Sequence, residues 1–380
     1  MTGSEATWIA LMVAIYASTH STVWMSAALF VTIAGQGVAT PLLGGLGDRM
    51  DRRKLMIGSE LSAAVVCAAM TFTHTPLALV VLALLASVAQ SPFIAASTAA
   101  VPNLIGSEGL SWANSQLAIG RNAGALLGPL VGGVLSGLID PYVVFGANAV
   151  CFTASAALIW TVHGTFADPE RSRLDEEQHE GLRAGFVFIW GDTVLRLMTL
   201  AWVVLLFLLG PVLVAELPLA HSFGAGSAGY GVLVACWGGG AIVGSFFGRR
   251  LAAFHERATM VIGAALIGAG FATVALAPMF GFALAGMAGA GAAEGAVSVA
   301  EQGILQRRTP DAVRSRATAA SEAAVMCAFA LSFPSAGFLI DLLGVRGVYM
   351  MGAVGCGLSA LILVYSMRAL GASREVAAAV

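Results

Sequence analysis

The feature that most constrains this chain is its succession of long apolar runs, separated by short polar or glycine-containing stretches. A helix needs about 20 mostly apolar residues to cross a bilayer, and a helix satisfies its own backbone hydrogen bonds there. We therefore predict an all-α membrane protein with twelve transmembrane helices, the first of them short or truncated. The predicted spans lie near residues 6–19, 22–46, 55–73, 76–101, 112–138, 141–163, 194–219, 228–249, 258–278, 280–304, 317–340 and 346–368.

Composition excludes several classes of protein. Of the 380 residues, 58% are hydrophobic and 11% are charged, whereas soluble domains carry about 25% charged residues. A soluble enzyme and a nucleic-acid-binding protein are therefore excluded. Lys54 is the only lysine, and the sequence contains no GxxxxGK[ST] nucleotide loop and no HExxH metal motif. We interpret the five cysteines, which all lie in apolar runs, as small core residues, and we expect no enzymatic activity, no cofactor and no metal.

The basic residues indicate how the chain is oriented. Of the 19 Lys and Arg residues, 17 fall on one side of the predicted spans. Positively charged loops favour the cytoplasmic side of a membrane. Both termini are therefore predicted to face the cytoplasm, as an even number of spans requires.

Two halves of the sequence repeat each other. Pro129-x-x-Gly132 recurs as Pro334-x-x-Gly337, and a polar stretch separates the halves. Duplicated halves of this kind are typical of secondary transporters, whose substrates bind where the halves meet. The predicted parts are an N-terminal six-helix half at 1–164, a cytoplasmic linker at 165–192 and a C-terminal six-helix half at 193–380.

Two segments carry a family resemblance. The loop from Gly44 to Lys54, GGLGDRMDRRK, resembles the signature that the major facilitator superfamily carries after its second span, with Asp51 where glycine is commonest. The run from Gly120 to Gly133 resembles the fifth-span signature of exporters in that superfamily. The resemblance covers nearly the whole chain and is nearest to bacterial siderophore and macrolide exporters. It implies a transporter of the bacterial inner (plasma) membrane that works by alternating access.

The resemblance also implies a cytoplasmic latch. In it, the carboxylate of Asp48 would dock on the N-terminus of span 11 and pair with Arg49, Arg52 and Arg53. A helix N-terminus favours a negative charge, and arginine adds charge-assisted hydrogen bonds. The alternative is that the basic run serves topology alone.

The glycines of span 5 predict a close helix contact. The resemblance implies that Gly124, Gly128, Pro129 and Gly132 form a seam against span 8 of the other half, where Gly240 and Gly244 offer a smooth surface. Small residues four apart lie on one helix face and allow backbones to approach. The alternative is ordinary packing of small residues.

Acidic residues inside predicted spans are the candidates for proton coupling. Charges in a membrane are costly and usually functional. Glu294 lies about 14 residues into span 10 among small neighbours, and Glu301 follows on nearly the same face. Both are predicted to carry protons, the alternative being a structural ion pair. Glu60 and Glu322 lie closer to the cytoplasmic ends of spans 3 and 11, and we interpret them as snorkelling or locally paired.

Other polar and aromatic residues are candidates for lining the substrate cavity. Each also has a structural alternative, such as pairing within the protein, a hydrogen bond between helices, or packing in the core. These candidates are Gln90, Ser91, Arg121, Trp202, Glu216 and Trp237.

The sequence thus predicts a secondary active transporter. We expect it to export a small amphiphilic molecule, such as a drug, a siderophore or a secondary metabolite, in exchange for protons. Its partners would be that substrate, protons and the lipid bilayer, with no nucleic acid, and the protein would act as a monomer. The alternatives are an importer on the same fold and a truncated membrane protein that does not transport.

Overall fold

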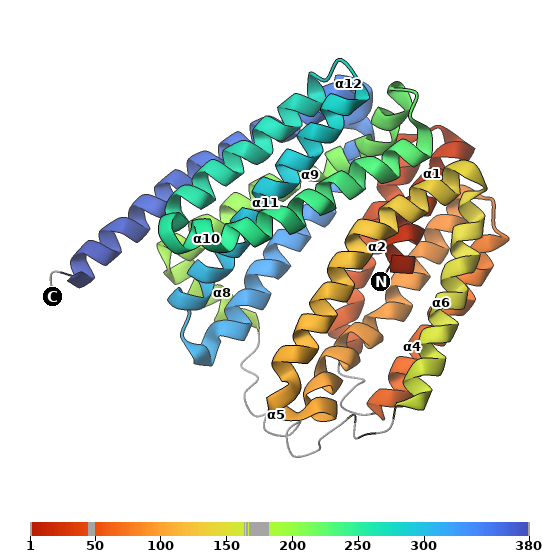
Figure 1. The fold of residues 1–380 in the computed structure, drawn as a ribbon, viewed down its shortest axis with the longest axis horizontal. Helices are drawn as coiled ribbons and strands as arrows, with labels where there is room; N and C mark the ends of the chain where they lie inside the picture. The colour runs from red at the N-terminus through yellow and green to blue at the C-terminus, as the bar shows by residue number, and fades with distance from the viewer. Residues whose placement is uncertain (1, 45–49, 163, 165, 167–181, 379–380) are drawn as a thin grey trace. The chain divides into compact units, whose positions relative to one another are not determined.

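A computed structural model describes residues 2–44, 50–162, 164, 166 and 182–378. All regular elements in these ranges are helices, which confirms the predicted all-α class (Figure 1). The helices are α1 (Thr2–Thr19), α2 (Thr22–Gly44), α4 (Arg52–Thr71), α5 (Pro76–Leu138), α6 (Pro141–Thr161), α8 (Leu182–Gly191), α9 (Thr193–Ser222), α10 (Gly226–Ala275), α11 (Phe280–Arg308) and α12 (Asp311–Ala378).

Several helices are long enough to cross a membrane more than once. The described residues contain 10 segments that are long and apolar enough to span. One of them, Arg316–Ser366, has 51 residues and is interrupted at Gly344, whose φ of 71° is left-handed. It therefore provides two passes, since about 20 residues suffice for one. With the shorter α1, the segments are consistent with the predicted twelve.

Aspartates and prolines in the sequence explain where several helices begin. Asp51 accepts hydrogen bonds from the backbone N–H groups of Arg53 and Lys54 and so caps α4. Asp140 and Asp192 cap α6 and α9 in the same way. Such caps satisfy donors that the first helical turn leaves unpaired.

The chain forms two compact units, and the first comprises residues 1–179 together with 226–231. Within it, α1 lies along the second arm of α5, the span Ser115–Leu138. A Cβ at Gly132 would stand 2.6 Å from the carbonyl oxygen of Ala6, and a Cβ at Gly128 would stand 2.9 Å from that of Thr2. Glycine is therefore required at these two positions, because any side chain would push the helices apart.

The second unit comprises residues 180–225 and 232–380. Its α9 packs along α12. Helix α10 has two arms, a first that ends at Gly248 and a second over Ala258–Ala275, and the first packs along α11. Glycines four residues apart on α10 make the second contact possible, since a Cβ at Gly244 would overlap the backbone of Ala292, and one at Gly248 would stand 2.7 Å from Cα of Ala296. Most of the predicted linker, residues 167–181, lies outside the described residues.

The cysteines do not all lie in the core. Cys67 and Cys356 are buried, but Cys151 on α6 and Cys327 on α12 are exposed. The prediction that all five are core residues is wrong for these two. Both lie in apolar stretches of their helices, so an outward-facing thiol there replaces any other small residue at little cost.

Candidate functional site

Three carboxyl groups come together in the second unit. Glu294 and Glu301 lie on α11 seven residues apart, which places them on one face about two turns from each other. Glu301 is also close enough to Glu322 on α12 for the two charges to interact. Glu294 and Glu301 are half-buried, and Glu322 is exposed. The cluster therefore runs from an exposed acid to two half-buried acids.

A tryptophan from a third helix completes the cluster. The indole of Trp202 on α9 is a hydrogen-bonding neighbour of the Glu301 carboxyl group. Its Nε1 atom is buried and makes no hydrogen bond of ordinary geometry. Near Glu301, this N–H can stabilise negative charge on the carboxyl group. The role of Trp202 in lining a substrate cavity stays a prediction.

Side-chain hydrogen bonds hold α12 against α9 at this level. The hydroxyl of Thr199 lies 3.0 Å from that of Ser321, the residue before Glu322. Further along α12, the hydroxyl of Ser366 donates to the carbonyl oxygen of Val194 at 3.0 Å. These contacts fix where Glu322 emerges relative to Trp202.

The charges around one end of α9 form ion pairs rather than an open site. Asp192 accepts two hydrogen bonds from Arg308, from Nη2 at 2.8 Å and from Nε at 3.0 Å. Arg307 forms an ion pair with Glu256. No group of three metal-ligating side chains occurs in the described part of the chain.

Glu216 lies apart from this cluster. It is 14 residues beyond Trp202 on α9, about 21 Å along a helix, and only 8% of its surface is exposed. One turn earlier, Val212 packs against Gly352 of α12. The structure thus places this predicted cavity residue in packed surroundings.

Trp237 belongs to an aromatic stack inside the second unit. Its ring lies parallel to that of Phe271, with centroids 5.5 Å apart and planes at 7°. Phe271 in turn meets Tyr349 edge-on at 6.1 Å. One face of the indole is therefore occupied by protein, which favours the structural alternative for this residue.

The candidates on α5 differ from one another. Ser91 is fully buried, and its hydroxyl donates to the carbonyl oxygen of Ser87 at 3.0 Å. That bond satisfies the Ser91 hydroxyl within its own helix. Gln90 is half-buried and Arg121 is exposed, so both remain available to a ligand.

Half of the predicted latch can be described. Asp48 and Arg49 lie outside the described residues. Arg52 is buried, and the guanidinium of Arg53 donates to the carbonyl oxygen of Trp160 in the last turn of α6. It also lies over the ring of Phe166, 5.9 Å from its centroid. Arg53 therefore stabilises the end of a helix in its own unit, where a cation is favoured. The latch itself stays a prediction.

The predicted seam residues differ in their closest contacts. Gly128 and Gly132 meet α1, whereas Gly240 and Gly244 meet α11. Sequence reasoning did not single out Gly133, whose Cβ would stand 2.6 Å from Cα of Gly231. Pro129 does meet α10, because its carbonyl oxygen lies against Gly231. The seam as a whole, including Gly124, stays a prediction.

Two acids make contacts that the sequence analysis did not expect. Glu60 was expected to snorkel, but only 4% of its surface is exposed, and it accepts a hydrogen bond from Ser155 of α6. Glu322 was expected to snorkel or pair locally; it is exposed, and it also lies near Glu301. Neither contact has a sequence signal, because each joins residues far apart in the chain.

Comparisons with known proteins agree on the architecture. A model of the Major Facilitator Superfamily matches residues 1–215 and 207–378. Among solved structures, a bacterial homologue of the iron transporter ferroportin has a TM-score of 0.75 at 14% identity, covering 96% of this chain and 95% of that one. A bacterial homologue of the human lysosomal transporter Spinster has a TM-score of 0.76 at 11% identity, covering 97% and 95%. At these identities, the likeness shows the fold.

Curated relatives match a shorter stretch. Multidrug resistance protein MdtG of Proteus mirabilis is 30% identical over 135 residues, 36% of this chain and 32% of the relative. MdtG of Enterobacter lignolyticus is 32% identical over 135 residues, 36% of this chain and 31% of the relative. The matched stretch thus spans about a third of these curated relatives.

Proposed function

The chain belongs to the Major Facilitator Superfamily, and from this premise we propose that it exports a small amphiphilic molecule in exchange for protons. The observation that carries the proposal is the cluster of Glu294, Glu301 and Glu322 on membrane-spanning helices. The similarity to proteins named for multidrug resistance supports export. Drugs, siderophores and secondary metabolites are the candidate cargo.

The three acids suggest a route for the proton. Glu322 is exposed and would exchange protons with water. Glu301 is its neighbour inside the bundle and would receive the proton next, and Glu294 would hold it two turns further along α11. Carboxylates at such spacing repel one another, so a proton shared among them lowers the cost of keeping all three in one place. Substrate binding between the halves is part of the same proposal.

The proposal also covers the location of the protein. It would lie in a bacterial inner membrane as a monomer, with both termini in the cytoplasm. Reporter fusions at each terminus test this. Alkaline phosphatase activity at either end would contradict the orientation, since that enzyme needs the periplasm to form its disulfides.

The test of function is dye and drug accumulation in an efflux-deficient bacterium. Cells would carry this chain, the Glu294→Gln variant or an empty vector, with and without an uncoupler. We expect the chain to lower accumulation and both the uncoupler and Glu294→Gln to abolish that effect. Export by Glu294→Gln at the unmutated rate would remove the coupling role of Glu294. Raised rather than lowered accumulation would identify an importer.

The latch is a separate proposal with its own test. If Asp48 closes the cytoplasmic side, Asp48→Asn should reduce transport while leaving expression intact. Transport by this variant at the unmutated rate would remove the latch and leave the exporter proposal standing.

A further inference from the structure

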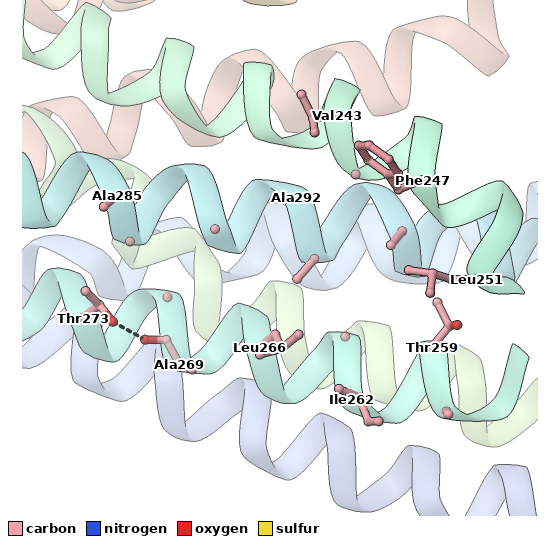
Figure 2. A pocket seen from close by; sticks show the side chains of 18 residues that line it. Val243, Phe247, Leu251, Thr259, Ile262, Leu266, Ala269, Thr273, Ala285 and Ala292 are labelled. Atoms are coloured by element: carbon pink, nitrogen blue, oxygen red, sulfur yellow. Dashed lines mark hydrogen bonds between the residues drawn. The ribbon is translucent and has the colours of Figure 1, made fainter. Parts of the chain in front are cut away.

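A long groove runs along the second unit, away from the acidic cluster. The two arms of α10 form its walls and α11 forms its floor, and its volume is about 810 Å³ (Figure 2). Val243 and Phe247 stand on one wall, and Ile262 and Leu266 stand on the other. All four are exposed, so the groove opens to the outside of this unit.

The groove is apolar and lies at membrane depth. Its walls and floor belong to the spans Gly226–Gly248, Ala258–Ala275 and Phe280–Arg308. Of its two threonines, Thr273 donates its hydroxyl to the carbonyl oxygen of Ala269 at 2.8 Å. The groove therefore offers nothing that a polar ligand would need, and the hydrocarbon of the bilayer is the medium at its mouth.

The floor is made of the smallest residues. Ala285 and Gly289 are exposed there, and a Cβ added to Gly289 would meet no atom within 4 Å. Gly289 thus differs from Gly244, which α11 needs for close packing. Empty space beside a residue with no side chain leaves room for a foreign group.

The length of the groove fits one hydrocarbon chain. The wall from Thr259 to Thr273 spans 14 residues, about 21 Å at the rise of an α-helix. One leaflet of a bilayer contributes about half of the 30 Å hydrocarbon core. An acyl chain of a phospholipid can therefore lie along about 15 Å of this groove.

An exposed arginine is the sequence neighbour of a residue at one end of the groove. Leu251 lines that end, and the preceding residue, Arg250, is exposed. An exposed arginine at the end of a membrane span is well placed to bind a lipid phosphate. Charge and apolar surface are thus arranged in the same order as in a phospholipid.

We propose that the groove holds one acyl chain of an anionic phospholipid, whose phosphate lies at Arg250. The site is distinct from the proton cluster. Ala292 and Ala296 line the groove, and Glu294 between them faces the opposite side of α11, since two residues along a helix turn by about 200°. The bound lipid would pack against the face of α11 that is opposite Glu294.

The test uses two glycines that have equal space around them. Gly289→Leu fills the groove, whereas Gly357→Leu adds the same bulk on α12, where a Cβ also meets no atom within 4 Å. The delipidated proteins would be titrated with dioleoylphosphatidylglycerol and bound lipid counted by native mass spectrometry. We expect about tenfold weaker binding for Gly289→Leu, because the leucine displaces about two methylene groups, and unchanged binding for Gly357→Leu.

Further variants keep the proposal falsifiable. If Gly289→Leu does not fold, Ala285→Leu fills the same floor one turn away. Arg250→Gln should weaken binding of phosphatidylglycerol more than that of phosphatidylcholine. Equal lipid binding by the groove-filling and control variants would overturn the proposal. So would a Gly289→Leu protein that keeps its lipid but loses binding of the transported dye, because the groove would then hold the cargo.

Discussion

An acidic residue inside the helix bundle has different neighbours in the two units. In the first, Glu60 is 4% exposed and accepts a hydrogen bond from Ser155. In the second, Glu301 lies between two further acids and beside an indole N–H. A carboxyl group with one fixed hydroxyl partner is held in place, whereas neighbouring carboxyl groups can pass a proton between them. Neighbouring groups, and not depth in the membrane alone, therefore distinguish a candidate coupling residue from a structural acid.

The helix caps show a parallel difference. Asp51 in the first unit and Asp192 in the second each accept hydrogen bonds from two backbone N–H groups. Asp192 also binds Arg308 of α11 through two hydrogen bonds. The second cap therefore joins two helices, and the first stabilises one.

The largest expected contrast is between Glu301→Gln and Glu60→Gln. Glu301→Gln removes the central proton carrier and should lower uncoupler-sensitive export by about 100-fold, the scale of a lost proton-transfer group. Glu60→Gln keeps an oxygen that can accept from Ser155 and should stay within about twofold. Initial rates of dye efflux from energised cells, at matched expression, measure both. Equal losses of export in the two variants would contradict the proposed difference between Glu301 and Glu60.

The caps give the next contrast, in stability. Asp51→Ala should lower the free energy of unfolding by about 1 kcal/mol through the lost cap. Asp192→Ala should cost about 2 kcal/mol, since it also leaves the partly buried Arg308 without its carboxylate. Thermal unfolding in detergent micelles reports the order. If Asp192→Ala costs no more than Asp51→Ala, the pair with Arg308 contributes no net stability.

Glu322→Gln should have a smaller effect on transport than Glu301→Gln. Glu322 is exposed, so water can replace part of its role, and we expect export to fall by about tenfold. Thr199→Val removes the hydroxyl partner of Ser321 and should act in the same direction by displacing Glu322. Export by Glu322→Gln as low as that of Glu301→Gln would make Glu322 an equal partner.

Trp202→Phe should have the smallest effect. It keeps the ring and removes the N–H beside Glu301, a loss of about 1 kcal/mol or about fivefold in rate. Trp237→Phe is the matched control, since the face of its ring is occupied by Phe271. If both variants transport alike, the indole N–H does not assist Glu301.

Local sequence patterns predicted the fold. The composition of the acidic cluster depends on contacts between residues that are far apart in the chain. The apolar runs located the spans, and the spacing of Glu294 and Glu301 on one helix placed both on one face. The sequence could not predict that Glu322 and Trp202 reach Glu301, because they come from α12 and α9. It also could not predict that Ser91 bonds within its own helix or that Arg53 reaches Trp160.

The glycine-rich helices show the same difference between what local sequence patterns predict and what contacts between distant residues determine. The sequence indicated that glycines four apart on α5 and α10 would meet other helices closely. It did not determine which helices, because any small-residue surface fits another. The contacts with α1 and α11 follow from how each unit folds around them.

The two exposed thiols are natural attachment sites for a pair of distance probes. Cys151 belongs to the first unit and Cys327 to the second, and the buried Cys67 and Cys356 are shielded from reagents. Spin labels on the two exposed positions would form one pair across the units once the half-buried Cys236 is replaced by serine. Pulsed dipolar spectroscopy on that pair would follow the opening and closing of a transport cycle in a protein that differs from the natural chain at a single residue.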